Sequence, residues 1–159
     1  MDTPDVIVKD IMSEDVVVVF PDTSLVDAAK LLSHHKFNGL PVVNEENKLA
    51  GIITEYDLIT NGTMMHIPTL QKIWKDATGE RETKNSELRV EVDKIMDFCV
   101  KDVMNKEPMT ILETTSYEEA LKIFASHHRV NPIPVLNEKQ ELVGVISRID
   151  ILKPLMKAR

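Results

Sequence analysis

Two short polar motifs in this sequence combine residue types that could bind a ligand. Thr54-Glu55-Tyr56-Asp57 and Ser147-Arg148-Ile149-Asp150 each place a hydroxyl three residues before an aspartate. If a helix begins at the hydroxyl, its free backbone amides and its dipole favour a phosphate group there. The aspartate then lies one turn further along the same face, where its carboxylate can accept hydrogen bonds from both hydroxyls of a ribose. The spacing therefore predicts a nucleotide site, although most motifs of this kind are ordinary helix N-caps.

The two motifs differ in the charge and polarity around them. The second contains Arg148 and has Arg129 and Lys153 nearby in the sequence, and Thr110 at the start of the first strand of that copy is another possible donor. The first has Glu55 and Val18 at the positions equivalent to Arg148 and Thr110. Because a carboxylate repels phosphate and valine offers no side-chain hydrogen bond, we expect tighter binding at residues 147–150. The alternative interpretation of Arg148 is a solvated surface charge.

An internal repeat positions both motifs. Val8-Lys9-Asp10-Ile11-Met12 recurs 92 residues later as Val100-Lys101-Asp102-Val103-Met104, and residues 33–59 align without a gap on residues 126–152. The identical pairs in that alignment include Asn38/Asn131, Pro41/Pro134, Val42/Val135, Asn44/Asn137, Gly51/Gly144, Ile53/Ile146 and Asp57/Asp150. Self-similarity of this length indicates two copies of one structural unit.

Each copy predicts the element order β-α-β-β-α. A β-branched run (residues 16–20 and 109–112) predicts a first strand, and Ser24-x-x-Asp27 and Ser116-x-x-Glu119 predict helix starts with capping boxes. Two short strands joined by a polar turn follow (residues 40–54 and 133–147), which is typical of a hairpin. A second helix is expected from Glu55 and from Arg148. Neither copy can bury both faces of its sheet alone, so we expect the two to pack as one module.

The segment between the copies has no counterpart in either. Residues 61–99 carry two helical patterns, one starting near Pro68 and one from Leu88 to Cys99. We expect two inserted helices that cover the module or present Trp74 to a partner.

Composition disfavours several classes of partner. The 159 residues include 19 basic and 26 acidic side chains, a net charge of −7, and 43% are apolar. Non-specific binding to nucleic acid or anionic membrane depends on clustered Lys and Arg, so neither partner is expected. The longest apolar run, residues 16–20, is too short to span a membrane. The single cysteine, Cys99, and the acidic start of the chain favour a cytoplasmic protein.

The repeated signatures resemble the tandem cystathionine-β-synthase (CBS) domain, or Bateman module. The resemblance covers about residues 8–60 and 100–156 through the Val-Lys-Asp-Ile/Val-Met opener, the Asn-x-Leu/Ile-Pro-Val strand start and the Gly-x-Ile-Ser/Thr-x-x-Asp turn. It implies an α/β (α+β) fold in which two repeats (1–60 and 100–159) form one pseudo-two-fold module around an insert (61–99). It also implies binding of AMP, ADP, ATP or S-adenosylmethionine as a regulatory ligand and pairing of modules into disc-like homodimers. It does not imply catalysis, and it requires no cofactor.

The resemblance also implies how the ligand is held. The Ser/Thr and Asp of each turn contact phosphate and ribose, and adenine lies against Leu40-Pro41 or Ile133-Pro134. The preferred second site then comprises Thr110, Asn131, Pro132, Ile133, Pro134, Ser147, Arg148 and Asp150. The first site, expected to be weak, empty or suited to S-adenosylmethionine, comprises Val18, Asn38, Gly39, Leu40, Pro41, Thr54 and Asp57.

Two other classes of function compete with a ligand sensor that signals to a partner protein. The runner-up is a protein-interaction or dimerisation module with vestigial pockets. An enzyme is not expected, because the sequence has no phosphate-binding glycine loop and offers only His34-His35 and His127-His128 as bases near a nucleotide. Those adjacent histidines do not predict a metal site, since helical neighbours point about 100° apart.

Overall fold

The computed structural model describes residues 6–60 and 98–156 of the chain. The expected helical insert, with Trp74, lies outside these residues. The first repeat contains α1 (Val8–Ile11), α2 (Leu25–His35), β1 (Gly39–Val43), β2 (Leu49–Thr54) and α3 (Glu55–Thr60). The second contains α6 (Val100–Val103), β3 (Ile111–Leu112), α7 (Tyr117–Ser126), β4 (Ile133–Leu136), β5 (Leu142–Ile146), α8 (Arg148–Ile151) and α9 (Lys153–Met156).

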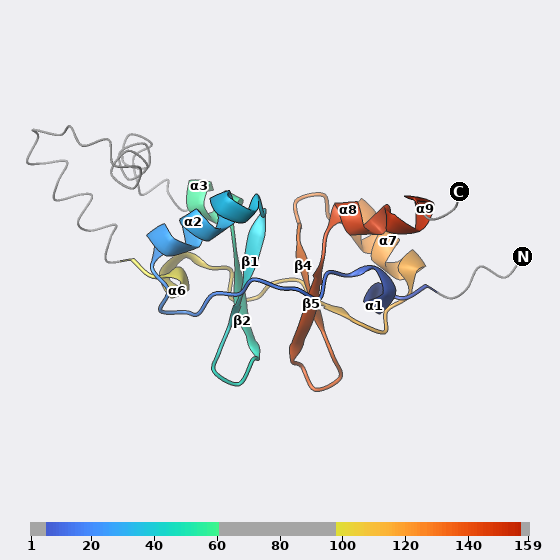
Figure 1. Ribbon diagram of the computed structural model, residues 1–159, viewed down its shortest axis with the longest axis horizontal. Coiled ribbons are helices and arrows are strands. Elements are labelled where there is room, and N and C mark those ends of the chain that lie inside the picture. The colour runs from blue at the N-terminus through green and yellow to red at the C-terminus, as the bar shows by residue number, and fades with distance from the viewer. Residues whose placement is uncertain (1–5, 61–97, 157–159) are drawn as a thin grey trace, which may run out of the picture.

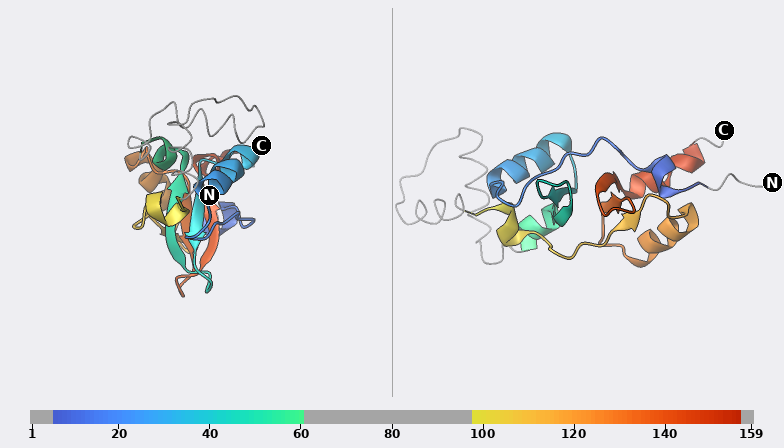
Figure 2. Two further views of the ribbon diagram at one scale, coloured as in Figure 1. Left: turned by 90° about the vertical axis from the view of Figure 1, so that its left-hand side faces the viewer. Right: turned by 90° about the horizontal axis from the view of Figure 1, so that it is seen from below.

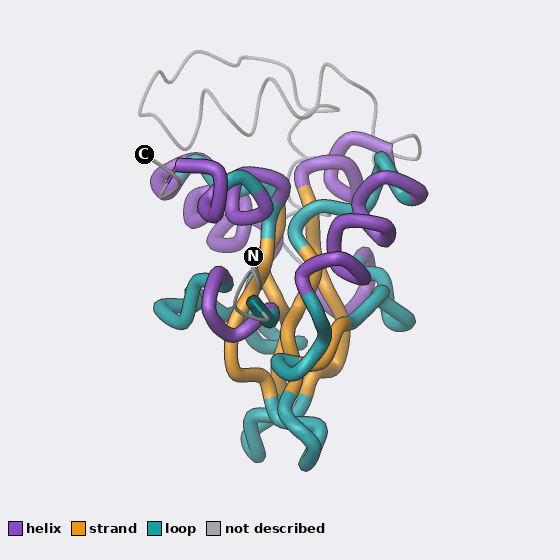
Figure 3. The backbone as a smooth tube through the Cα atoms, turned by 90° about the vertical axis from the view of Figure 1, so that its right-hand side faces the viewer, coloured by secondary structure: helices purple, strands orange, loops and turns teal. Residues whose placement is uncertain are grey.

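Two antiparallel hairpins, β1-β2 and β4-β5, stand side by side at the centre of the molecule, with helices on both outer flanks (Figure 1). Each hairpin turn is tied by an asparagine: the Asn44 and Asn137 side chains each accept hydrogen bonds from two backbone amides of their own turn. Most of the helices lie toward the end opposite these turns, whereas α1 and α6 lie lower, beside the strands (Figure 1, Figure 3). The α+β class and the packing of two repeats into one module are confirmed.

Helices α1 and α6, which contain the two Val-Lys-Asp-Ile/Val-Met openers and are called the opener helices below, are exchanged between the repeats. Helix α1 of the first repeat packs in the core of the second, where Val8 is 0% exposed, and α6 packs in the core of the first, where Val100 is 0% exposed. Figure 2 shows α1 (dark blue) beside the C-terminal helices and α6 (yellow) beside α2. Each opener lysine also forms an ion pair across the exchange, Lys9 with Glu113 and Lys101 with Asp22. The spatial halves of the molecule therefore differ from the sequence halves.

Two strand glycines allow the segment that follows each opener helix to pack closely against a strand of the other repeat. Ser13 pairs with Val145 through backbone bonds of 2.9 and 3.0 Å, and Asn105 pairs with Ile52 in the same way. A Cβ on Gly51 would lie 2.5 Å from the Asn105 carbonyl oxygen, and a Cβ on Gly144 would lie 2.6 Å from the Met12 sulfur. Glycine at these strand positions is thus explained by close approach of another chain segment.

The expected first strands are shorter than the β-branched runs that predicted them. In the second repeat only Ile111–Leu112 form a strand, parallel to β4. In the first repeat the run at residues 16–20 forms a single parallel bridge, Val19 to Val42. The reason is that these valines separate to different cores: Val19 is buried within the first repeat, whereas Val16 and Val18 pack between the hairpins against Val43.

Both main helices begin at the expected serine caps. Ser24 accepts from the Asp27 amide at 3.1 Å, and Ser116 accepts from the Glu119 amide at 3.3 Å. The reciprocal carboxylate bonds of a capping box are not among the contacts of the described residues. Each cap serine instead forms an antiparallel bridge with the residue before an exchanged helix, Ser24 with Cys99 and Ser116 with Ile7.

Candidate functional site

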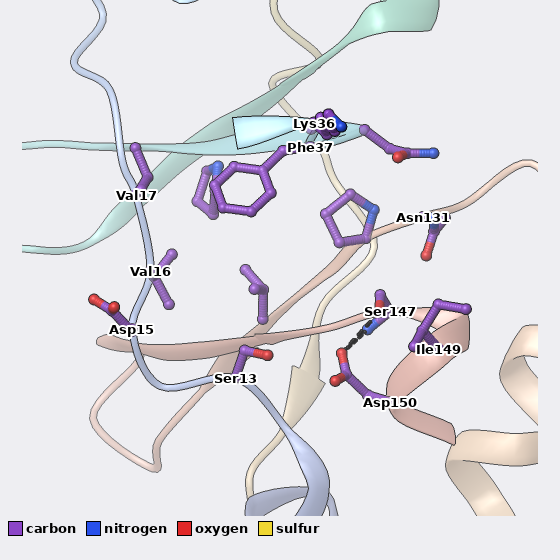
Figure 4. A pocket seen from close by; sticks show the side chains of 15 residues that line it. Ser13, Asp15, Val16, Val17, Lys36, Phe37, Asn131, Ser147, Ile149 and Asp150 are labelled. Carbon is purple, nitrogen blue, oxygen red and sulfur yellow. Dashed lines mark hydrogen bonds between the residues drawn. The ribbon is translucent and has the colours of Figure 1, made fainter. Parts of the chain in front are cut away.

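A cavity of about 400 Å³ lies between the two repeats, beside the second hydroxyl–aspartate turn (Figure 4). Its lining comes from both repeats: Ser13, Asp15, Val16, Val17, Lys36, Phe37, Asn38, Gly39, Pro41, Asn131, Pro132, Val145, Ser147, Ile149 and Asp150. A molecule in this cavity would contact the segment after α1, the end of α2 with the start of β1, and the start of α8.

The polar end of the cavity is the turn from Ser147 to Asp150. The Ser147 amide and hydroxyl both donate to Oδ2 of Asp150, at 2.7 and 2.8 Å. The Asp150 residue is only 6% exposed, and its Oδ1 pairs with the Lys153 ammonium at 2.6 Å. The turn therefore presents a fixed, buried carboxylate at the N-terminus of a short helix.

Thr54–Asp57 repeats the same turn in the first repeat. The Thr54 amide and hydroxyl donate to Oδ2 of Asp57 at 2.9 and 2.8 Å, and the Asp57 amide donates to the Thr54 hydroxyl at 3.2 Å. Asp57 is half-buried, and neither residue lines the cavity. The capping interpretation of the motif is correct for both copies, because one carboxylate oxygen serves the helix start in each.

The opener helices show the same capping without a hydroxyl. Asp10 accepts from the Ile7 amide at 3.0 Å, and Asp102 accepts from the Cys99 amide at 2.9 Å. A cap alone thus needs only the aspartate. The added hydroxyl of Ser147 or Thr54 is the feature that separates the candidate ligand turns from plain caps.

Apolar side chains line the cavity on both sides of the polar turn. Val16 and Val17 line one side, and Phe37 and Ile149 contribute exposed apolar surface. The Phe37 ring stacks on His35 with ring centroids 5.1 Å apart and planes within 10°. A flat aromatic ligand fits such a surface, because stacking needs one broad apolar face on each partner.

The charges on the cavity lining nearly balance. Lys36 lies at the end of α2 in the left-handed conformation, with φ of 55°. It contributes the positively charged side chain of the described lining. Asp15 and Asp150 are the lining carboxylates, and Lys153 neutralises Asp150 from outside the cavity. The described lining therefore suits a ligand with a small anionic group better than one with many charges.

The residues expected at the second site are only partly brought together. Asn131, Pro132, Ser147 and Asp150 line the cavity. Arg148 does not, although its amide donates to the Asn131 side chain at 3.1 Å. Ile133 and Pro134 are fully buried in β4, and Thr110 is exposed outside the cavity.

The residues expected at the first site are divided. Asn38, Gly39 and Pro41 line the same cavity as Ser147 and Asp150. Leu40 is fully buried, and Val18 packs between the hairpins. The strand starts of both repeats thus meet at one cavity, and Gly39 lies against Pro132, its counterpart in the alignment.

Sequence reasoning missed the contribution of the first repeat to the second turn. Ser13, Asp15, Val16 and Val17 reach the cavity because α1 packs on the second repeat. The glycines at 51 and 144 were an available signal, since a glycine within a strand marks a close backbone approach.

The histidine pair of the first repeat and Cys99 do not form a ligand-binding group in the described part of the chain. His34 and His35 contact each other edge-on with centroids 5.0 Å apart, and within residues 6–60 and 98–156 no group of three metal-ligating side chains occurs. Cys99 is half-buried at the start of α6. Across the same residues, no helix is long and apolar enough to cross a bilayer.

Comparisons with known proteins agree with this architecture. The family model described as CBS domain matches residues 8–62 and 100–157. A CBS domain-containing protein of Dictyostelium discoideum is 32% identical over 152 residues, which cover 96% of this chain and 92% of that protein. Several other relatives are longer, and the chain spans between 22% and 61% of their lengths.

Solved structures share the fold. CBSX2 from Arabidopsis thaliana, in complex with AMP, is similar with a TM-score of 0.70 at 24% identity, covering 95% of this chain and 96% of that chain. The CBS domain pair of protein MJ0100, in complex with 5′-methylthioadenosine and S-adenosyl-L-methionine, gives a TM-score of 0.68 at 22% identity, covering 98% and 100%. The chain therefore belongs to the CBS domain family, as a tandem pair of CBS domains.

Proposed function

We propose that this protein is a regulatory module that binds an adenosine-containing ligand in the cavity beside Ser147 and Asp150. The observation that carries the proposal is the pairing of a fixed carboxylate turn with an apolar wall in one cavity built from both repeats. A nucleoside has this division of character, with a polar sugar joined to a flat base.

The ligands of the related structures support the choice of adenosine. CBSX2 holds AMP, and the MJ0100 domain pair holds 5′-methylthioadenosine and S-adenosyl-L-methionine. These three molecules share adenosine and differ in the charge of the group on the 5′ carbon. AMP suits the described lining best among the four expected ligands, because Lys36 can meet one phosphate and no second lining cation is available for a longer chain.

The proposed binding mode assigns one task to each part of the cavity. Asp150 accepts from the ribose and Lys36 donates to the phosphate, while the Ser147 amide and hydroxyl hold the Asp150 carboxylate in place. The base lies against Phe37 and Val17. We propose no catalysis.

The regulatory step follows from the two-sided lining. A ligand that contacts both repeats favours the relative orientation in which both sets of contacts form, and its effect is limited by its differential affinity for the two orientations. In this proposal a homodimer or a regulated protein in the cytoplasm reads that shift.

A thermal-shift titration tests the proposal. AMP, ADP, ATP and S-adenosylmethionine are compared with GTP, on the wild type, Asp150→Ala and the matched variant Asp57→Ala. A ligand at one hundred times its Kd adds about 2.7 kcal/mol to the free energy of unfolding, which is several degrees for a chain of this size. A shift with AMP that survives Asp57→Ala and disappears in Asp150→Ala supports the proposal, and no shift with any adenosine compound contradicts it.

Exposed apolar residues favour one second candidate, an interaction or dimerisation module with vestigial pockets. Ile149, Leu152, Leu155 and Met156 are 47–75% exposed on α8, α9 and the residue between them. In that case, light scattering would detect association that Asp57 and Asp150 substitutions leave unchanged, without stabilisation by any adenosine compound.

A further inference from the structure

The Asp150 carboxylate has little capacity left for a ligand. A carboxylate has two oxygens and about four positions at which it accepts hydrogen bonds. Oδ2 takes two bonds from Ser147, at 2.7 and 2.8 Å, and Oδ1 takes the Lys153 ammonium at 2.6 Å. Three of the four positions are therefore occupied before any ligand arrives.

Lys153 is held in place from a second side. Its Nζ also donates to the Ile11 carbonyl oxygen at 2.7 Å, and Ile11 is buried at the end of the exchanged helix α1. The Lys153 side chain is 39% exposed and does not line the cavity, whereas the Asp150 side chain is 8% exposed. Lys153 thus acts on the cavity through Asp150, and its own position is fixed by the opener of the other repeat.

The first repeat lacks this arrangement. Asp57 accepts the same two bonds from Thr54, but the residue aligned with Lys153 is Thr60. In the part of the chain that the structure describes, no lysine or arginine forms an ion pair with Asp57. The lysine is therefore a feature of one turn and is not required by the capping geometry itself.

We propose that Lys153 is a positioning residue that limits Asp150 to a single hydroxyl of the bound ribose. This inference rests on the proposed function, because it assigns a sugar to that carboxylate. A carboxylate without the lysine can accept from both hydroxyls of a vicinal diol. With Lys153 bound to Oδ1, Asp150 accepts a hydrogen bond from one ribose hydroxyl and none from the other.

Deoxynucleotides distinguish these two modes of recognition. Calorimetric titrations would compare AMP with 2′-deoxy-AMP and 3′-deoxy-AMP. For the wild type we expect one of the two deoxy compounds to bind about tenfold or more weakly than AMP, and the other to bind within about twofold. In Lys153→Met we expect both deoxy compounds to bind at least about fivefold more weakly than AMP, because both hydroxyls then reach Asp150.

Three further variants separate positioning from folding. Lys153→Gln loses the charge and its side chain is one bond shorter than that of lysine, so it should leave Oδ1 of Asp150 free and behave as Lys153→Met. Lys153→Arg restores a cation and should restore selectivity for a single hydroxyl. Lys122→Met, on the exposed face of α7, is the matched control and should keep the wild-type pattern.

The outcomes distinguish this inference from the proposed function. If AMP binds the wild type and requires Asp150, but both deoxy compounds lose affinity equally in the wild type, the role of Lys153 is wrong and the proposed function stands. The same conclusion follows if Lys153→Met and Lys153→Gln keep the wild-type selectivity. If AMP does not bind the wild type at all, the proposed function is overturned and this inference with it.

Discussion

Thr54–Asp57 and Ser147–Asp150 form the same turn in two different surroundings. In both, one carboxylate oxygen accepts from the backbone amide and the hydroxyl at the helix start, at 2.7–2.9 Å. Only Ser147 and Asp150 line the described cavity, and only Asp150 has a lysine on its second oxygen. The motif therefore makes a turn in each repeat, and the residues supplied by the other repeat decide what that turn can bind.

The meeting of the two strand starts at one cavity determines which residues those are. The second turn receives Lys36 and Phe37 from the first repeat. In the aligned repeats their counterparts are Arg129 and Val130, so the pseudo-two-fold relation assigns those residues to the first turn. The positive charge expected beside Ser147 from nearness in sequence is thus supplied from across the module, and an aromatic wall is available to the second turn.

The largest effect on stability is expected at the glycines that the exchanged segments approach. Gly51→Ala should destabilise the protein by about 3 kcal/mol, because its Cβ would lie 2.5 Å from the Asn105 backbone oxygen, which cannot move alone. Gly144→Ala should cost about 1 kcal/mol, since its closest neighbour is the flexible Met12 side chain. Urea unfolding measures both, and an equal or reversed order would contradict this account of the two crossings.

Truncating an opener should weaken the opposite repeat. Val8→Ala removes a fully buried side chain from the second core and should cost about 2 kcal/mol. Hydrogen exchange should show the larger loss of protection at Val135 and Ile146, rather than at Leu40 and Ile53. Val100→Ala is the matched variant and should reverse that pattern; loss within the variant's own sequence repeat would rule out the exchange.

The aromatic wall should matter for the second turn alone. Phe37→Ala is expected to weaken AMP binding about five- to tenfold, in keeping with about 1 kcal/mol for one stacked base. Val130→Ala, at the aligned position, should leave this affinity unchanged. Calorimetric titration of both variants measures the difference, and equal losses would show that the base lies elsewhere.

The smallest effect is expected from the opener ion pairs. Glu113 raises the pKa of Lys9 above 10.5 by a hydrogen bond and by charge attraction, and Asp22 does the same for Lys101. Because the folded-state pKa is raised, the stabilisation is complete below pH 10.5 and disappears as the pH rises through the folded-state value.

The difference in Tm between wild type and Lys9→Gln should therefore be small at pH 8 and absent well above pH 10.5. Lys139→Gln is the control, because Lys139 forms no ion pair within the described residues. A difference that grows at high pH would contradict the sign of the pKa shift.

Much of the fold could be predicted from the sequence, because its signals are local. The serine caps and the polar hairpin turns depend on neighbours in the chain, and the repeat itself is visible as aligned identities such as Gly51 and Gly144. The exchange of openers could not be predicted, since the apolar pattern of Val8 and Ile11 is the same whichever core buries them. For the same reason Ser147 and Asp150 were identifiable as candidates, while Ser13 and Phe37 were not.

The most direct test of the central claim is a calorimetric titration of AMP into wild type, Asp150→Ala and Asp57→Ala. Circular dichroism melts on the same samples establish that each variant is folded, and Asp150→Asn, which keeps the side-chain shape, is a second variant at the decisive position. The account predicts that AMP binding survives Asp57→Ala and is lost in both Asp150 variants. Binding that persists without Asp150, or that is lost with Asp57 alone, would contradict it.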